Sequence, residues 1–376
     1  MTVAPERPVE IDTAPRTWLR PSDEPVSRPT ATARRAVTRS TAQDLLVGAG
    51  SLVSALALAW VICFRILPWG TVLAYAVVSF LLFLVILTVS AASVAPGPIV
   101  ADRVAAAVVT AGALVVGLAI VTTVVFTFVR AAPALPHLNL FTQDMSMAGP
   151  RDPLSVGGVL HAIVGTLIQI GIAIVITVPL GIGTAVFMTE VGGRFSQVVR
   201  TVVEAMTALP SIVAGLFIYT VFIVALGLNP SGLAAALALS VMMLPIIARA
   251  ADVVLRVFPS GLREAGLALG APRWRTVWHV VLPTTRPGLA TALILGVARG
   301  VGETSPVLLT SGASSFLTVN PIGAPMNSLP LFVFTAVRSG EPLLIQRGFA
   351  AAAILLTLVL MLFVVARLVA RKKDAR

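Results

Sequence analysis

Three ionisable side chains stand within or at the ends of long apolar segments. They are Arg249, Arg299 and Glu303. A charged side chain at the centre of a membrane-spanning helix costs about 2.5–3.5 kcal/mol on insertion scales, so we do not expect these residues to face lipid unpaired. Arginine offers a fork of donors that matches the oxygens of phosphate and similar anions. These residue types therefore predict a route for an oxyanion through a membrane.

Arg299 and Glu303 are four residues apart, so on a helix they share one face and form a buried ion pair, with glycines between them that admit another helix. Two interpretations remain open. In the first, Arg249, Arg299 and Thr304 line the anion route, and Glu303 tempers the positive charge so that the anion can leave. In the second, the pair locks helices together and Arg249 is a basic anchor at the cytoplasmic end of its helix. Glu204 either meets one of these arginines or lies at the membrane interface.

The composition indicates which elements must position these residues. Apolar residues make up 57% of the 376 residues and charged residues 11%, whereas soluble domains average about 45–50% and 25%. A helix that crosses the hydrocarbon layer needs about 20 apolar residues. Such stretches occur at 45–64, 71–95, 104–129, 160–189, 202–228, 231–250, 288–310 and 348–370. We predict an all-α integral membrane protein with about eight transmembrane helices.

The basic residues indicate the orientation of these helices. The net charge is +11, but the arginines lie between and beside the apolar stretches and form no single stripe, so nucleic acid is not an expected partner. With eight crossings, every second connection between the helices lies on the same side of the membrane. The connections on one side are rich in arginine, whereas the long loops 131–159 and 311–346 on the other side carry few basic residues. Because cytoplasmic loops hold an excess of Arg and Lys, we place both termini in the cytoplasm.

The segment 251–287 is too polar to span and too apolar to be a plain linker. Within it, residues 260–270 predict a short helix that begins at a capping serine and ends at a glycine. Its apolar face would hold Leu262, Ala265 and Leu269. Because Gly266 and Gly270 have no side chains, they would leave a shallow surface on which another protein could pack closely. Such a helix suits a groove on a partner.

This segment also carries a motif. Its residues are Glu264, Ala265, Gly266, Gly270, Leu282 and Pro283. Their spacing resembles the EAA loop of ABC importer permeases, with Gly266 where that family usually has alanine. The resemblance covers roughly 104–370, and the segments Leu209–Phe217, Leu244–Arg249 and Ala298–Pro306 are similar to phosphate permeases of the PstA type.

The resemblance implies a MetI-like core of six helices at 104–370, preceded by an extra helix pair at 44–103. A disordered cytoplasmic tail at 1–43 and a basic cytoplasmic end at 371–376 complete the expected organisation. In this family the loop forms a coupling helix that docks on an ATPase subunit through the motif residues. The expected partners are a second, homologous permease subunit, a dimer of ATPase subunits, and an extracytoplasmic binding protein that delivers phosphate at the bacterial plasma membrane.

Several kinds of chemistry are not expected from this chain. Lys372 and Lys373 are its only lysines, so a Walker A lysine is missing, and ATP and Mg²⁺ would be used by the separate ATPase subunit. The three histidines have no metal-binding spacing, and we expect neither an enzyme nor a bound cofactor. Two alternatives remain: an ABC permease for another oxyanion, a metal or an amino acid, and a secondary transporter that works without ATP.

Overall fold

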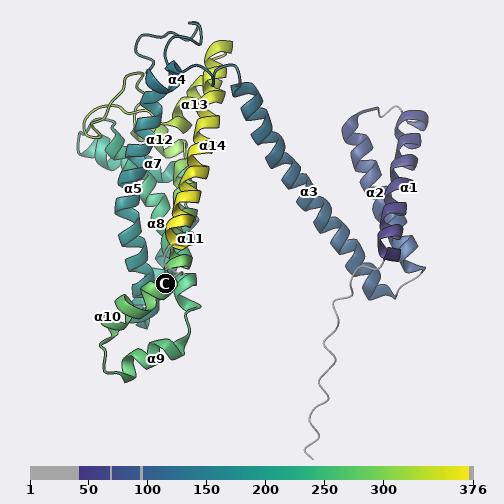
Figure 1. Ribbon diagram of the computed structural model, residues 1–376, viewed down its shortest axis with the longest axis horizontal. Coiled ribbons are helices and arrows are strands. Elements are labelled where there is room, and N and C mark those ends of the chain that lie inside the picture. The colour runs from purple at the N-terminus through teal and green to yellow at the C-terminus, as the bar shows by residue number, and fades with distance from the viewer. Residues whose placement is uncertain (1–41, 68–69, 94–95, 372–376) are drawn as a thin grey trace, which may run out of the picture. The chain divides into compact units, whose positions relative to one another are not determined.

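The computed structural model describes residues 42–67, 70–93 and 96–371, and the regular structure within these ranges is helical (Figure 1). The all-α prediction is thereby confirmed. Nearly all of the tail predicted at 1–43, and all but the first residue of the basic end predicted at 371–376, lie outside the described residues. The chain divides into two compact units, residues 1–117 and 118–376.

The first unit holds a pair of antiparallel helices, α1 (Ala42–Val61) and α2 (Val72–Ala92). A short π-helical turn, η2 (Ile62–Ile66), extends α1. Near the start of α2, the hydroxyl of Tyr75 donates to the carbonyl of Leu56 at 3.3 Å, and its ring packs on Phe64. Both helices are long and apolar enough to cross a membrane, as the first two apolar stretches predicted. The next helix, α3 (Gly97–Ala131), continues from this unit into the second.

In the second unit, α8 (Gly232–Arg256) packs between α5 (Leu160–Val186) and α11 (Leu282–Val301). Helices in lipid gain no hydrophobic energy by meeting, so small residues that allow close contact hold them together. A Cβ atom at Gly181 of α5 would lie 2.8 Å from Ile247 of α8, and one at Gly296 of α11 would lie 2.4 Å from the same side chain. The absence of these methyl groups is what lets the three helices touch.

The stretch predicted as one span at 202–228 is a bent pair of helices. The first is α6 (Gly193–Thr207), and the second is α7 (Ser211–Ile218) with its π-helical extension η4 (Tyr219–Ala225). The helix direction bends by 103° between the two. Pro210 has an extended ψ of 138° at the break and cannot donate a backbone hydrogen bond. Counted as one span, the pair brings the candidate spans to eight in the described residues.

The span predicted at 288–310 lies earlier in the chain. The helices α10 (Arg273–Thr276), η5 (Val277–Val281) and α11 form one continuous run over residues 273–301, and a separate short helix, α12 (Ser305–Thr310), follows. The prediction failed because the arginines and prolines of 273–287 lower the apolar content at the start of this helix. Much of the segment predicted as a loop is therefore helical, and α8 extends into it as far as Arg256.

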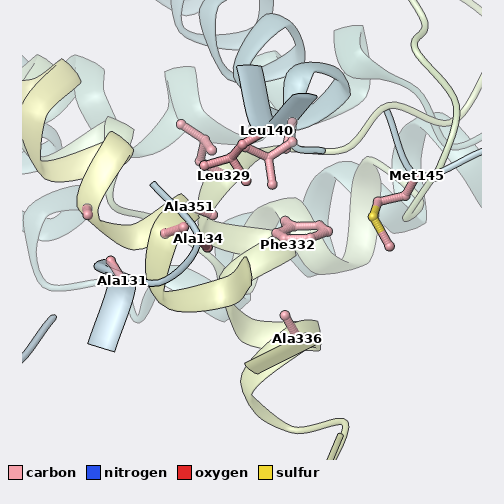
Figure 2. Close-up of a cluster of buried hydrophobic side chains, with 12 residues drawn as sticks. Ala131, Ala134, Leu140, Met145, Leu329, Phe332, Ala336 and Ala351 are labelled. Atoms are coloured by element: carbon pink, nitrogen blue, oxygen red, sulfur yellow. The ribbon is translucent and has the colours of Figure 1, made fainter. Parts of the chain in front are cut away.

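At the end of the second unit opposite α9 (Ser260–Ala268), the loops form a packed cap. Two short helices, α4 (Asn139–Thr142) and α13 (Leu329–Val337), lie there beside the start of α14 (Pro342–Arg371). Figure 2 shows side chains of this core, including Leu140, Phe332 and Ala351, which are buried together. The segments 131–159 and 311–346, which carry few basic residues, thus contribute to a hydrophobic core with α5 and α14.

A hydrogen-bonded carboxylate joins the two loops of the cap. One oxygen of Asp144 accepts the backbone N–H of Leu317 at 2.9 Å, and the other accepts the hydroxyl of Ser146. The Ser146 hydrogen bond is the main cause that lowers the pKa of the Asp144 carboxyl. Nearby, the backbone N–H of Met145 donates to the carbonyl of Ser315. Loops more than 150 residues apart in sequence are therefore held edge to edge.

Arg347 of α14 is the buried cation of the cap. It is 1% exposed, and its Nη2 donates to the carbonyls of Asp152, Pro153 and Val156 at 3.1, 2.8 and 2.7 Å. A buried backbone carbonyl without a donor is costly. Arg347 therefore fixes the loop that precedes α5, a role that nothing in the sequence indicated.

We predict that Arg347→Met lowers the free energy of unfolding by roughly 3 kcal/mol, because it removes a buried charged donor that joins three carbonyls of one loop. Thermal unfolding of the purified chain in detergent measures the loss, and limited proteolysis between residues 143 and 158 should become faster. The control is Arg151→Met. Arg151 pairs with Glu341 at 2.9 Å but is 84% exposed, so this change should leave unfolding nearly unaltered. Equal behaviour of the two variants would contradict the role of Arg347.

Candidate functional site

The short helix α9 lies between α8 and the run 273–301, close to the position predicted at 260–270. It ends at Gly270, which has a φ of +80°. The N–H of Gly270 donates to the carbonyl of Leu267, and the N–H of Ala271 donates to that of Gly266. This pair of hydrogen bonds is a Schellman ending, which favours glycine at the left-handed position. Gly270 thus sets where the helix stops, in addition to leaving open space beside it.

The outer face of α9 is apolar and open. Leu262 and Leu269 are exposed, Leu269 to 89%, and Ala265 and Glu264 are also exposed. Gly266 does not belong to this face, because a Cβ atom there would lie 2.9 Å from the Thr276 side chain of α10. The expectation that Gly266 forms part of a surface for another protein is therefore wrong. Its lack of a side chain lets α9 pack on α10.

The last two motif residues lie apart from α9. Leu282 and Pro283 begin α11, within the continuous run 273–301, and both are half-buried. Leu282 packs against a buried cluster that includes Ala185 of α5 and Leu255 of α8. The structure thus brings Glu264 and Ala265 together on an exposed helix, whereas Leu282 and Pro283 lie at the base of a spanning helix.

An ion pair anchors α9 to the end of α5. The Nη2 atom of Arg263 lies 2.7 Å from Oε1 of Glu190, whose side chain is 12% exposed. Glu190 belongs to η3 (Phe187–Val191), the π-helical continuation of α5. The guanidinium of Arg263 also stacks 5.5 Å from the ring centroid of Phe258. Sequence reasoning missed this pair because its members are 73 residues apart.

A buried carboxylate lies one helix away. Asp252, expected at the start of a loop, is buried in the last turns of α8, where its side chain is 1% exposed. Its two oxygens lie 3.1 Å from Arg200 of α6 and 3.1 Å from Arg256. Arg200 and Ser196 of α6 both donate to the carbonyl of Met188 in η3. These contacts fix α6 to α8 and to the end of α5. The only signal in the sequence was the four-residue spacing of Asp252 and Arg256.

The structure pairs Arg249 of α8 with Glu204 of α6. Both side chains are about half exposed. This contact settles the position of Glu204, which the sequence left open. Because α6 carries both Arg200 and Glu204, it holds two ion pairs to α8 on successive turns.

The predicted Arg299–Glu303 pair is present, but its burial differs from the prediction. Nη2 of Arg299 lies 3.3 Å from Oε1 of Glu303, so the predicted contact is confirmed. Glu303 is 14% exposed, but Arg299 is 56% exposed in the single chain, so the expectation of a buried pair holds for the carboxylate alone. α11 ends at Val301, and Thr304 is the half-buried residue before α12. Among the intervening glycines, Gly300 packs closely on Met243 of α8, whereas Gly302 meets no other helix.

Arg299 lines a cavity of about 320 Å³ beside the break in the bent pair. Thr207 and Leu209 contribute from the break, and Met242 and Ile246 from α8. Arg299 is the one charged residue in this lining. Ile246 of α8 lines this cavity, and Arg249 follows it by about one turn. Arg249 therefore belongs to the face of α8 that borders the cavity with Arg299. The arrangement can hold an anion at Arg299 and present a second, paired arginine further along.

The bent pair is positioned by its contact with α12. A Cβ atom at Gly215 of α7 would lie 2.6 Å from the Cα atom of Pro306. This close approach places the break at Leu209 and Pro210 next to the segment that carries Glu303 and Thr304. The sequence segments that resembled the phosphate permeases therefore meet around one cavity, although some 90 residues separate them.

The chain is similar in sequence to known proteins over more than half of its length. The family model described as "Binding-protein-dependent transport system inner membrane component" matches residues 177–374. The phosphate transport system permease protein PstA 1 of Mycobacterium tuberculosis H37Rv is 42% identical over 215 residues, which are 57% of this chain and 70% of that protein. The PstA protein of Pasteurella multocida is 32% identical over 249 residues, 65% of this chain and 86% of that protein.

Among solved structures, an inward-facing form of the MetNI methionine ABC transporter is 22% identical, with a TM-score of 0.46 over 57% of this chain and 93% of that one. The family match spans more than half of the chain and includes α9 and the residues around the cavity. The chain thus belongs to the family of binding-protein-dependent transport system inner membrane components, and within it resembles the PstA-type permeases.

Proposed function

We propose that this chain is one membrane-spanning subunit of an ATP-driven importer that moves inorganic phosphate into a bacterial cytoplasm. The observation that carries the proposal is Arg299, a charged residue at a cavity beside a helix break. The similarity to proteins named as phosphate permeases supports the choice of ion. A guanidinium offers two parallel donors to a phosphate, and it keeps its charge at any physiological pH.

The neighbours of Arg299 make the proposed site a transient one. A route for an ion must bind well enough for entry and weakly enough for release. Glu303, 3.3 Å away, offsets part of the charge of Arg299. Arg249 is likewise paired, with Glu204, so neither arginine presents an unopposed charge. As phosphate passes, each arginine would replace its carboxylate partner with phosphate oxygens. Thr304 would lie beside the ion at Arg299.

We further propose that α9 is the helix that docks on an ATPase subunit. Its exposed apolar face of Leu262, Ala265 and Leu269 suits a groove on another protein. The Arg263–Glu190 pair would pass movement of α9 to η3. From there the hydrogen bonds of the Met188 carbonyl lead to α6, which carries Glu204. This chain of contacts is a continuous physical link from the docking face to the proposed route.

The remaining partners follow from the same proposal. A second, homologous permease subunit would complete the route, and an extracytoplasmic binding protein would deliver the phosphate. Two ATPase subunits would use ATP and Mg²⁺, and this chain would hold no cofactor. Both termini would be cytoplasmic, on the side of α9. Another tetrahedral oxyanion such as sulfate is the second candidate cargo, because a guanidinium fork fits either anion.

For the ion route, we predict that Arg299→Gln lowers phosphate uptake about 10- to 100-fold, because a hydrogen bond to a charged group contributes about 1.5–3 kcal/mol. Uptake of radiolabelled phosphate into vesicles that hold the complete importer measures the effect. Excess sulfate in the same assay tests the second candidate. Arg338→Gln is the control, because Arg338 is an exposed arginine that stacks on Phe334 away from the cavity. Unchanged uptake in Arg299→Gln would leave the Arg299–Glu303 pair with a packing role only.

For the docking face, we predict that Leu269→Glu releases the ATPase subunit, because a charge replaces an apolar contact at the most exposed leucine beside α9. Co-purification of the ATPase with the permease measures retention, which should fall at least tenfold. Leu138→Glu is the matched control, since Leu138 is 80% exposed and immediately precedes α4, which lies at the opposite end of the unit. Gly270 is a poorer target, because its positive φ makes any side chain there strain the helix end.

For the link between them, we predict that Glu190→Gln and Arg263→Gln each lower the phosphate moved per ATP hydrolysed, while the ATPase stays bound. If the two groups act as one contact, the double variant should be no worse than either single variant. Transport and ATP hydrolysis measured on the same vesicles give this ratio. Additive losses in the double variant would contradict a shared role.

A further inference from the structure

A large groove lies between α11 and α14, away from the cavity at Arg299. Its volume is about 930 Å³, near the upper end of the range of small-molecule sites. α11 contributes Pro287, Ala290, Thr291 and Ile294, of which only Ile294 is large. α14 contributes Leu360 and Phe363 among other large apolar residues. Three short side chains of α11 therefore face bulky ones on α14.

The groove belongs to the part of the protein that lipid surrounds. Both walls are candidate membrane spans, residues 273–301 and 342–368. A narrower cleft of about 150 Å³ shares Ile294, Val359 and Phe363 with it and continues along α11 as far as Val301. From Pro287 to Val301, α11 rises about 21 Å at 1.5 Å per residue. That length exceeds one leaflet of the hydrocarbon layer, which is about 15 Å thick.

One arginine belongs to the lining at one end of the groove, and a second adjoins that end along α11. Arg367 of α14 is the charged residue of its lining. Arg286 precedes Pro287 and stands one turn before Ala290 on α11, so it continues the same face. Both are exposed, and in the described part of the chain neither has an ion-pair partner. This end is the one from which the run 273–301 begins, next to α9.

We propose that this groove binds an anionic phospholipid, with an acyl chain along α11 and the headgroup phosphate on Arg367 and Arg286. The acyl chain alone gives little preference, because the surrounding lipid is as apolar as the groove. Selectivity must therefore come from the charge at its end, where guanidinium groups favour phosphate oxygens. Basic pockets between spanning helices are suited to anionic headgroups. The proposal is independent of which ion the permease carries.

The first test is native mass spectrometry of the purified full chain with phosphatidylglycerol or phosphatidylcholine of the same acyl length. We expect at least tenfold greater retention of phosphatidylglycerol. Arg367→Gln should abolish the preference, and Ala290→Trp, which fills the groove, should abolish retention of the bound lipid. The matched controls are Arg338→Gln and Leu295→Trp, since Leu295 is exposed on α11 outside the groove lining. Equal retention of the two lipids, or an unchanged Arg367→Gln variant, would overturn the proposal.

The second test identifies the occupant in a bilayer. Cys63 is the only cysteine, so Ile294→Cys in a Cys63→Ala background accepts a single photoreactive maleimide in the groove lining. After illumination in phosphatidylglycerol vesicles, a lipid adduct on residue 294 supports the proposal. An adduct with a protein helix, from a second copy or from a partner subunit, would show that protein covers the groove and would refute the lipid site.

Discussion

The close packing of α8 against α5 and α11 is the contact on which the arrangement of the site depends. Ile247 meets Gly181 on one side and Gly296 on the other, and Met243 meets Gly300. Between helices in lipid, close contact of this kind replaces the hydrophobic effect. This contact fixes the rotation of α8 and α11 about their axes. It therefore determines that Arg299 and the face of α8 that carries Arg249 border the same cavity. A methyl group at any of these glycines would push the helices apart.

Charge organises the end of the second unit near α9. Asp252 is buried between Arg200 and Arg256, and Glu190 meets Arg263. A buried carboxylate is tolerated only with such partners. Together these contacts connect α5, α6, α8 and α9 at that end of the unit.

The proposed importer explains why the site is exposed on one side. Arg299 is more than half exposed in the single chain, and so are the large apolar residues Leu216 and Phe217 of α7. A charged residue on a lipid-facing surface would be disfavoured. A second permease subunit against this side would enclose the arginine and complete the cavity. The groove between α11 and α14 is a separate surface whose arginines lie at its end.

The sequence by itself determined the features that depend on neighbours along the chain. Apolar stretches marked the spanning helices, a glycine marked the end of α9, and the four-residue spacing of Arg299 and Glu303 predicted their contact. These features follow from helix geometry and from the thickness of a bilayer. The predicted capping role of Ser260 was wrong, because Ser260 is the first residue of α9 and Pro259 precedes it without a side-chain cap. Composition failed where a spanning helix starts in a polar segment, as at 273–287, and where a proline breaks an apolar stretch, as at Pro210.

Only the tertiary structure decided which distant residues meet. Glu204 could have paired with any nearby arginine, and its partner Arg249 lies 45 residues away. The Glu190–Arg263 pair, the burial of Asp252 and the carbonyl contacts of Arg347 likewise join segments far apart in the chain. Gly266, expected on the outward face of its helix, instead lies against Thr276. Such contacts depend on the rotation and register of packed helices, which no local spacing encodes.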